Sequence, residues 1–357
     1  MDQLTPGRQT HIAGLDLLRI LSMVMIIGLH MLGQGGIVDA APPGSPTWYA
    51  SQGLQCLFYC SVNCYGLLSG YVGGKRSGSG SRLLLLWLTV EVYSVLFWVF
   101  FRWRSPELVG RQAFINAVFP LLMRQYWYFT GYFGLALIIP LISEGLERLD
   151  ERSAARRFFI LLLFFCLLPT AFHSDAFHMR GGYTTLWLLL LYLMGAALRR
   201  GRWFQRLGVL PLVLTGVICL GITYVTILWP LTIPFVSTFD FLSYSSPTVT
   251  LLAACLVLLF ARIRGKGGRG QAVLKELSRT SFGVYIIHTN PLLWWLSFPV
   301  GFLQHWASWP VWKLVLTVPA VAAAVYLVCA AVDYLRMLAF RALRLQQAAE
   351  RLFSRFD

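Results

Sequence analysis

The chain has 357 residues, of which 57% are apolar and only 13% are charged. A soluble domain carries about a quarter charged residues, so this composition excludes an ordinary water-soluble protein. The 30 Lys and Arg residues outnumber the 15 Asp and Glu residues, which gives a formal net charge of +15. Such an excess can indicate nucleic-acid binding. Here the basic residues lie between apolar stretches, which favours a membrane topology signal, and we expect no nucleic-acid partner.

Apolar stretches long enough to cross a bilayer recur along the whole chain. A transmembrane helix needs about 20 mainly apolar residues. The sequence therefore predicts an all-α fold, a polytopic membrane helix bundle of about ten transmembrane helices, forming one domain over residues 1–357. The second span contains Asn63 and several glycines, so we expect it to face protein rather than lipid. The predicted spans are 13–32, 52–73, 82–101, 126–144, 157–173, 183–199, 207–229, 247–262, 280–298 and 312–336.

The basic residues set the predicted orientation of these spans. Lys and Arg collect in cytoplasmic loops, and a cytoplasmic N-terminus places most of them on that side. We therefore expect both termini in the cytoplasm, with residues 336–357 forming a basic amphipathic helix on the membrane surface. The segment 107–123 is also amphipathic and is expected in the membrane interface. The basic residues left outside are Arg102, Arg104, Arg111, Arg124 and Arg180.

The cysteines and the loop histidines do not indicate a metal site. All seven cysteines lie in apolar segments without disulfide-framework or zinc-type spacing. We interpret them as small packing residues. His173 and His178 share a predicted outer loop with Asp175. That ligand set is too small to indicate a metal, so no metal is expected.

The first predicted span carries Asp16, Arg19 and His30, and ionisable residues inside a membrane are functional candidates by default. A helix advances about 100° and 1.5 Å per residue, so Arg19 and His30 share one face, about 16 Å apart along the axis. Asp16 is the neighbour of Arg19 at i, i+3. We expect His30 to move protons, Arg19 to bind an anionic group and Asp16 to hold Arg19. The alternatives are an ion pair at the inner interface and a histidine that only packs.

Other candidates lie on later spans. Glu91 could pair with the first-span arginine, hold a proton or orient the histidine, and a purely structural pairing is an equal alternative. His288 could orient a bound thioester or simply pack against a neighbour. Tyr71, Trp127 and Tyr128 are candidates for the wall of a substrate site, although packing and interface aromatics are commoner.

Four segments resemble motifs of the acyltransferase-3 membrane acyltransferases, in the order in which that family shows them. The first has the Arg-x10-His spacing of the family at Arg19 and His30. The second ends in the Ser-Gly-aromatic pattern, the third opens on Trp-aromatic, and the fourth carries the late-span histidine. The resemblance extends over most of the chain. The segments are 14–30, 62–74, 126–142 and 277–292.

This resemblance implies an O-acyltransferase that moves an acetyl or other acyl group from cytoplasmic acetyl-CoA (acyl-CoA) to a hydroxyl. The acceptor would be a cell-surface glycan, a lipid-linked glycan or a related envelope molecule. By this resemblance His30 would be the catalytic residue, and Arg19 would be a donor-binding or structural residue. The implied location is the plasma membrane, in a bacterium the inner membrane, with membrane lipids around the bundle.

The resemblance also indicates where the donor is expected to bind. Family members carry an arginine pair near the start of the third span, thought to meet the acyl-CoA. This chain has Arg82 there, with Lys75 and Arg76 just before it, and lacks the second arginine of the pair. Cytoplasmic cations at this position would suit the phosphates of CoA. We therefore expect Lys75, Arg76 and Arg82 to bind the donor.

Two other functions remain open at this point. The polar stripe on the first span could line the path of a small-solute exporter, because ionisable residues inside a membrane also mark permeation paths. A glycan-binding or assembly subunit without catalysis would use the same aromatic residues. The exporter requires no CoA-sized cationic mouth, and the assembly subunit does not require His30 for its activity.

Overall fold

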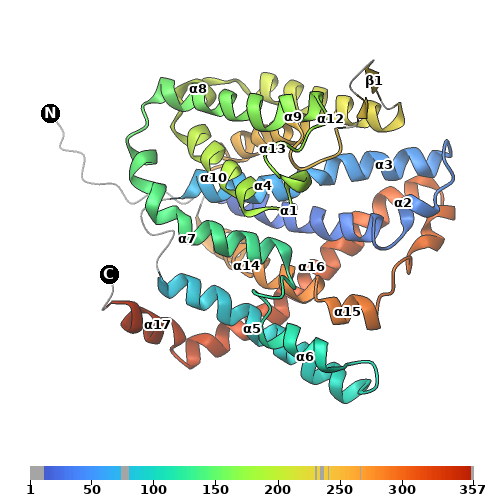
Figure 1. Ribbon diagram of the computed structural model, residues 1–357, viewed down its shortest axis with the longest axis vertical. Coiled ribbons are helices and arrows are strands. Elements are labelled where there is room, and N and C mark those ends of the chain that lie inside the picture. Colours follow the sequence, from blue (N-terminus) through green and yellow to red (C-terminus); the bar gives the residue numbers. More distant parts are fainter. Residues whose placement is uncertain are drawn as a thin grey trace.

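The computed structural model describes residues 12–73, 80–229, 231–233, 237–239, 241–265 and 267–354, and it is a helix bundle (Figure 1). The long helices run back and forth between two ends of the molecule, and α17 lies at the end where α1 begins. The helices are α1 (Ala13–Leu32), α2 (Ile37–Ala40), α3 (Pro46–Tyr59), α4 (Ser61–Val72), α5 (Gly80–Arg104), α6 (Arg111–Val118), α7 (Trp127–Glu147), α8 (Glu151–Leu162), η1 (Leu163–Leu167), α9 (Leu168–Ala171), η2 (Arg180–Gly182), α10 (Thr185–Arg200), α11 (Arg202–Arg206), α12 (Val209–Leu228), α13 (Pro247–Phe260), α14 (Gly268–His288), α15 (Pro291–Leu296), η3 (Gln304–Ser308), α16 (Val311–Ala342) and α17 (Leu345–Phe353).

Two three-residue strands, β1 (Leu231–Ile233) and β2 (Ser237–Phe239), form an antiparallel hairpin at the end of α12. The hairpin is a loop feature and leaves the predicted all-α membrane bundle intact.

Fewer helices than expected are long and apolar enough to cross a membrane on their own. Within the described residues there are six: α1, α5, α7, the continuous run Glu151–Ala171, α12 and α16. The predicted count of ten was therefore too high by this measure. The span 52–73 is interrupted between α3 and α4, and 183–199 and 247–262 fall on helices of only 16 and 14 residues. The span 280–298 covers the end of α14, whose first half is polar, and the separate α15.

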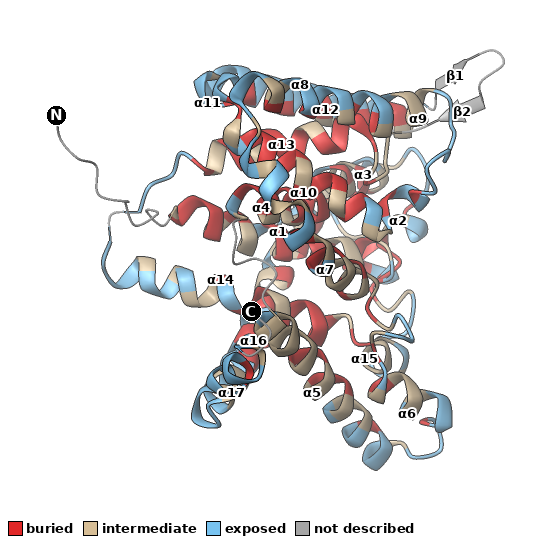
Figure 2. Ribbon diagram, turned by 60° about the vertical axis from the view of Figure 1, so that its left-hand side comes forward, coloured by how far each residue is buried: buried red, intermediate tan, exposed pale blue. Residues whose placement is uncertain are grey.

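The short helices α4, α10 and α13 form the buried centre of the bundle (Figure 2). A Cβ added at Gly70 would overlap the Tyr192 carbonyl oxygen, and one at Gly195 would overlap the Leu67 carbonyl oxygen. Glycine at both positions therefore lets the α4 and α10 backbones touch, as in other membrane helix pairs. Asn63 on α4 is fully buried, so this span faces protein as predicted.

Side-chain caps fix several helix starts. Ser45 accepts the Trp48 N–H at 3.1 Å at the start of α3. Asp150 accepts two backbone N–H groups at the start of α8, and its hydrogen bonds from Ser153 lower the pKa of that carboxyl. Asn290 caps α15 by accepting the Leu292 N–H at 3.0 Å. The last cap fixes the turn between α14 and α15, which carries residues of the site described below.

Both amphipathic helices expected from the sequence are present, one with different bounds. The segment 107–123 contains the amphipathic helix α6, which packs on α5. At the C-terminus, α16 continues to Ala342, and only α17 is a separate amphipathic helix. The predicted tail of 336–357 thus began too early. The break comes at Arg344, whose φ of 52° is left-handed and ends the preceding helix geometry.

Candidate active site

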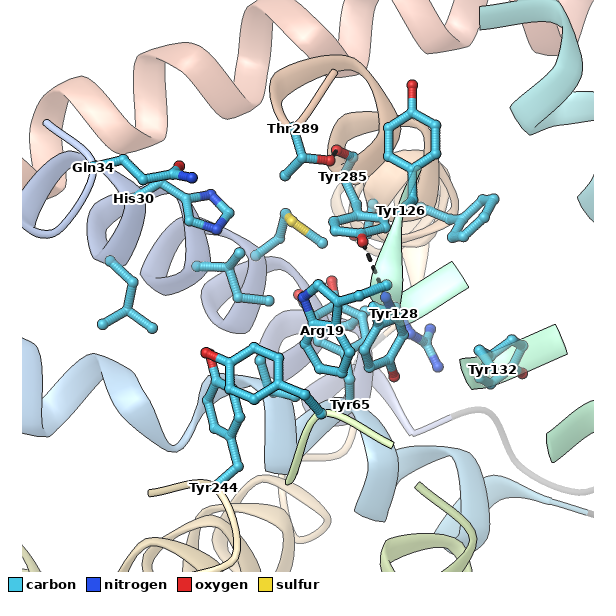
Figure 3. A pocket seen from close by; sticks show the side chains of 18 of the residues that line it. Arg19, His30, Gln34, Tyr65, Tyr126, Tyr128, Tyr132, Tyr244, Tyr285 and Thr289 are labelled. Carbon is cyan, nitrogen blue, oxygen red and sulfur yellow. Dashed lines mark hydrogen bonds between the residues drawn. The ribbon is translucent and has the colours of Figure 1, made fainter. Parts of the chain in front are cut away.

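A cavity of about 800 Å³ lies among α1, α4, α7 and α14. One face of α1 forms part of its wall, with Arg19, Met23, Ile26 and His30 at successive turns. The shared face derived from helix geometry therefore exists, and it faces a cavity rather than lipid. Figure 3 shows both side chains at this cavity, with Tyr65 and Tyr128 beside Arg19 and with Gln34 beside His30.

His30 and His288 form a hydrogen-bonded pair at the cavity wall. His30 Nδ1 lies 3.2 Å from His288 Nε2, and His288 Nδ1 lies 2.7 Å from the Val284 carbonyl oxygen. A carbonyl can only accept, so His288 Nδ1 must carry a proton. In a neutral ring His288 Nε2 then accepts, which makes His30 Nδ1 the donor. The lone pair of His30 Nε2 is left for a group in the cavity.

The pair is held from behind by α14 and α15. His288 is buried and does not line the cavity, so it reaches the site only through His30. The Trp294 indole donates to the His288 carbonyl oxygen. Its ring also stands edge-on to the His30 ring, with 6.0 Å between centroids. Trp294 therefore packs against the His30 ring, while the Val284 carbonyl orients the His288 imidazole.

Arg19 is anchored at the other end of the same α1 face. Its Nη1 donates to Ser278 Oγ at 2.8 Å and to Asp16 Oδ1 at 3.3 Å, and Ser278 donates to Asp16 Oδ1 at 2.9 Å. The Tyr65 hydroxyl donates to the Arg19 carbonyl oxygen at 2.8 Å. The predicted i, i+3 ion pair is therefore present and is cross-linked to α14 and α4. The guanidinium of Arg19 faces the cavity even though it forms this ion pair.

A second cavity, of about 460 Å³, adjoins this end, and Arg19 and Arg279 line both cavities. Tyr71 lines the second cavity and accepts a long hydrogen bond of 3.4 Å from Gln205. Tyr71 is thus separated from Trp127 and Tyr128, which line the main cavity.

Aromatic side chains form the wall of the main cavity at the end near His30. Tyr59 stacks on Tyr244 with 4.6 Å between ring centroids, and Trp127 lies 4.7 Å from Tyr183. Tyr183 and Tyr244 are 5.1 Å apart, which joins the two pairs into one cluster. All four rings line the cavity. We call Tyr59, Trp127, Tyr183 and Tyr244 the aromatic platform.

Buried hydrogen bonds hold the platform in place. Asn63 donates to the Tyr244 carbonyl oxygen at 2.7 Å and accepts from the Trp187 indole at 3.2 Å. The Tyr128 N–H donates to the Tyr285 hydroxyl at 3.3 Å, which ties the start of α7 to α14 (Figure 3). Asn63, which the sequence indicated only as protein-facing, therefore supports the cavity wall from behind.

Some residues predicted for the site lie elsewhere. Glu91 lines neither cavity, and its buried Oε2 has no hydrogen bond from any residue in the described ranges. Arg82 is exposed on α5 and also lines neither cavity. Lys75 and Arg76 lie outside the described residues. Of the roles left open for Glu91, pairing with Arg19 is absent, because Arg19 is bound by Asp16 and Ser278 instead.

Other lining residues were not identified from the sequence. Ser278 and Tyr65 carry no pattern that separates them from packing residues. Tyr183 and Tyr244 precede α10 and α13 in irregular segments, where no helical periodicity predicts the direction in which a side chain points. The sequence analysis used Arg279 only as one of the basic residues that set the orientation of the spans. Arg279 follows Lys275 by four residues in the polar half of α14, and this spacing could have predicted that the two side chains share one basic face of the helix.

A scan of family models matches the chain over residues 12–334 to an acyltransferase domain, that of the acyltransferase-3 family. Comparisons with curated proteins and with solved structures gave no match. The matched region contains both cavities and the His30–His288 pair. The apolar helices agree with this assignment. The chain therefore belongs to the acyltransferase-3 family and is a multi-pass membrane acyltransferase.

Proposed function

We propose that this acyltransferase moves an acetyl or other acyl group from cytoplasmic acyl-CoA to a hydroxyl of a cell-surface glycan or related envelope molecule. The observation that carries the proposal is the His30–His288 pair at a cavity that is cationic at one end and aromatic at the other. The proposed location is the cytoplasmic membrane of a bacterium, with the donor on the inner side and the acceptor on the outer side.

The reaction needs one base that later acts as an acid, and His30 fits this role. As the acceptor oxygen attacks the thioester carbonyl carbon, His30 Nε2 takes the hydroxyl proton. The carbon–sulfur bond then breaks, and the protonated His30 returns that proton to the CoA thiolate. The products are the acyl ester and free CoA. General acid–base catalysis of this kind contributes about 10²–10⁴-fold to the rate.

His288 acts as a positioning residue in this scheme. By accepting from His30 Nδ1 it keeps the lone pair on Nε2, where the acceptor hydroxyl would approach. When Nε2 gains a proton, the Nδ1–H bond to His288 remains in place and stabilises the charge. No proton has to pass through His288.

The character of each cavity end supports the assignment of the two substrates. Arg19 and Arg279 suit the anionic donor. At the other end, the platform offers flat apolar faces, and Gln34 and Gln55 offer amide groups. Sugar rings combine apolar C–H faces with hydroxyl rims, so this end suits a glycan acceptor.

Transfer of labelled acetyl from acetyl-CoA in native membranes tests the proposal. The wild type should place label in the envelope glycan fraction, and His30→Ala should lose about 10³-fold of that activity. His305→Ala is a matched control, because His305 is exposed on η3 and lines neither cavity. Full transfer by His30→Ala would remove His30 from the chemistry. No transfer by the wild type, together with passage of a labelled solute through proteoliposomes, would favour an exporter.

A further inference from the structure

The second cavity gathers positive charge from several parts of the fold. Arg19 comes from α1, Arg199 from the last turn of α10, Arg264 from the segment after α13, and Lys275 and Arg279 from α14. Residues distant in sequence therefore place cations around one space of about 460 Å³. Apart from Arg19, none of these residues is among the cations that the sequence indicated for the donor.

The positive charge of this cavity is only partly balanced by the protein. Asp16 is the acidic residue in its wall, and it is bound to Arg19. Arg279 pairs with Glu276 at 2.5 Å. Arg264 and Lys275 form no ion pair or hydrogen bond with the part of the chain that the structure describes. A concave site with surplus positive charge raises the local concentration of anions.

The arrangement favours an extended anion with several phosphates. Arginine forks bind phosphate oxygens in pairs, and Lys275 can add a point charge. Ile12, Leu15 and Tyr71 supply an apolar side to the same cavity, which suits a flat nucleobase. Arg19 and Arg279 line both cavities, so a ligand bound here could extend a flexible arm past them towards His30.

We propose that the second cavity binds the phosphorylated nucleotide end of an acyl-CoA donor, through Arg199, Arg264, Lys275 and Arg279. This inference rests on the proposed function, because it assigns one half of the donor to a defined site. The pantetheine arm passes Arg19, and the thioester lies in the main cavity. The nucleotide remains outside the reacting centre, so the second cavity contributes to donor affinity and not to the chemical step.

Two acyl donors distinguish nucleotide binding in the second cavity from the chemical step in the main cavity. Acetyl-CoA carries the nucleotide, whereas S-acetyl-N-acetylcysteamine has the same thioester and no phosphate. For the double variant Arg264→Gln/Lys275→Gln we expect the KM for acetyl-CoA to rise about tenfold or more, with little change in kcat. The KM for S-acetyl-N-acetylcysteamine should not change. Equal losses with both donors, or no loss with either, would overturn the proposal.

A control variant and a direct binding measurement complete the test. Arg206→Gln removes an exposed cation on α11 that lines neither cavity, and it should leave both KM values unchanged. Adenosine 3′,5′-bisphosphate should bind the wild type and lose at least tenfold in affinity for the double variant. A wild type that uses neither donor but still binds this nucleotide would contradict the proposed function while preserving the site. Displacement by phosphatidylglycerol with no binding of the nucleotide would identify a lipid site and overturn the inference.

Discussion

The two ends of the main cavity differ in how they would bind a substrate. At the Arg19 end the wall is cationic, and its polar groups are cross-linked by hydrogen bonds between α1 and α14. At the His30 end the wall is a cluster of aromatic rings, and its support comes from the buried Asn63, which donates to the Tyr244 carbonyl oxygen. An anion is favoured at the first end by charge, and a neutral ring is favoured at the second by shape and stacking.

Under the proposed function, this difference would let one helix contact both substrates. The α1 face spans about 16 Å from Arg19 to His30, so it reaches from one end to the other. The histidine lies near the aromatic end, where the proposed reaction would deprotonate the acceptor hydroxyl. The arginine lies where a charged donor would enter. Each end can therefore be altered by itself, and a variant at one end should change the KM for one substrate and leave the KM for the other unchanged.

Among the variants that alter one end of the cavity, the largest effect is expected at His288, which lies behind His30 at the aromatic end. The variant His288→Leu removes the acceptor for His30 Nδ1–H and should lower kcat about 10²-fold, because His30 loses its tautomer and orientation. The KM values for donor and acceptor should change little, because His288 does not line the cavity. Steady-state kinetics with each substrate varied in turn would measure both effects.

Glutamine at this position distinguishes positioning from packing. The side-chain oxygen of His288→Gln can accept from His30 Nδ1, so kcat should recover at least partly relative to His288→Leu. If the two variants were equally impaired, the hydrogen bond to His30 would not be the reason for the loss, and His288 would have a packing role only.

A smaller effect is expected at the aromatic end. Trp127→Leu and Tyr244→Leu keep apolar volume but remove the flat faces of the platform. Each should raise the acceptor KM about three- to tenfold, since aromatic stacking contributes about 0.5–1.5 kcal/mol beyond area burial. The acetyl-CoA KM should stay constant. Trp309→Leu is the control, because Trp309 stacks on Trp306 and does not line the cavity. A change in donor KM would show that the ends are not separate.

The sequence predicted much of the α1 side of the cavity and little of the opposite side. Helix periodicity places Arg19 and His30 on one face without any tertiary information. The partner of His30 could not be derived, because the contact of α1 with α14 joins residues 258 positions apart. The same limit applies to Tyr244, whose position depends on Asn63. Hydropathy also overestimated the number of helices long enough to cross a membrane on their own. It does not distinguish lipid-facing helices from short helices covered by protein, such as α10.

The smallest effect is expected from Asp16→Asn at the cationic end. The amide can still accept from Ser278, but its charge attraction to Arg19 is lost. Because the Arg19 side chain is 30% exposed, this pair is worth about 0.5–1 kcal/mol, and the acetyl-CoA KM should rise about two- to fivefold. Acceptor KM and kcat should not change. The variant also makes the cavity more positive, which acts in the opposite direction. A fall in acetyl-CoA KM would therefore show that total charge, rather than the anchored position of Arg19, governs donor binding at this end.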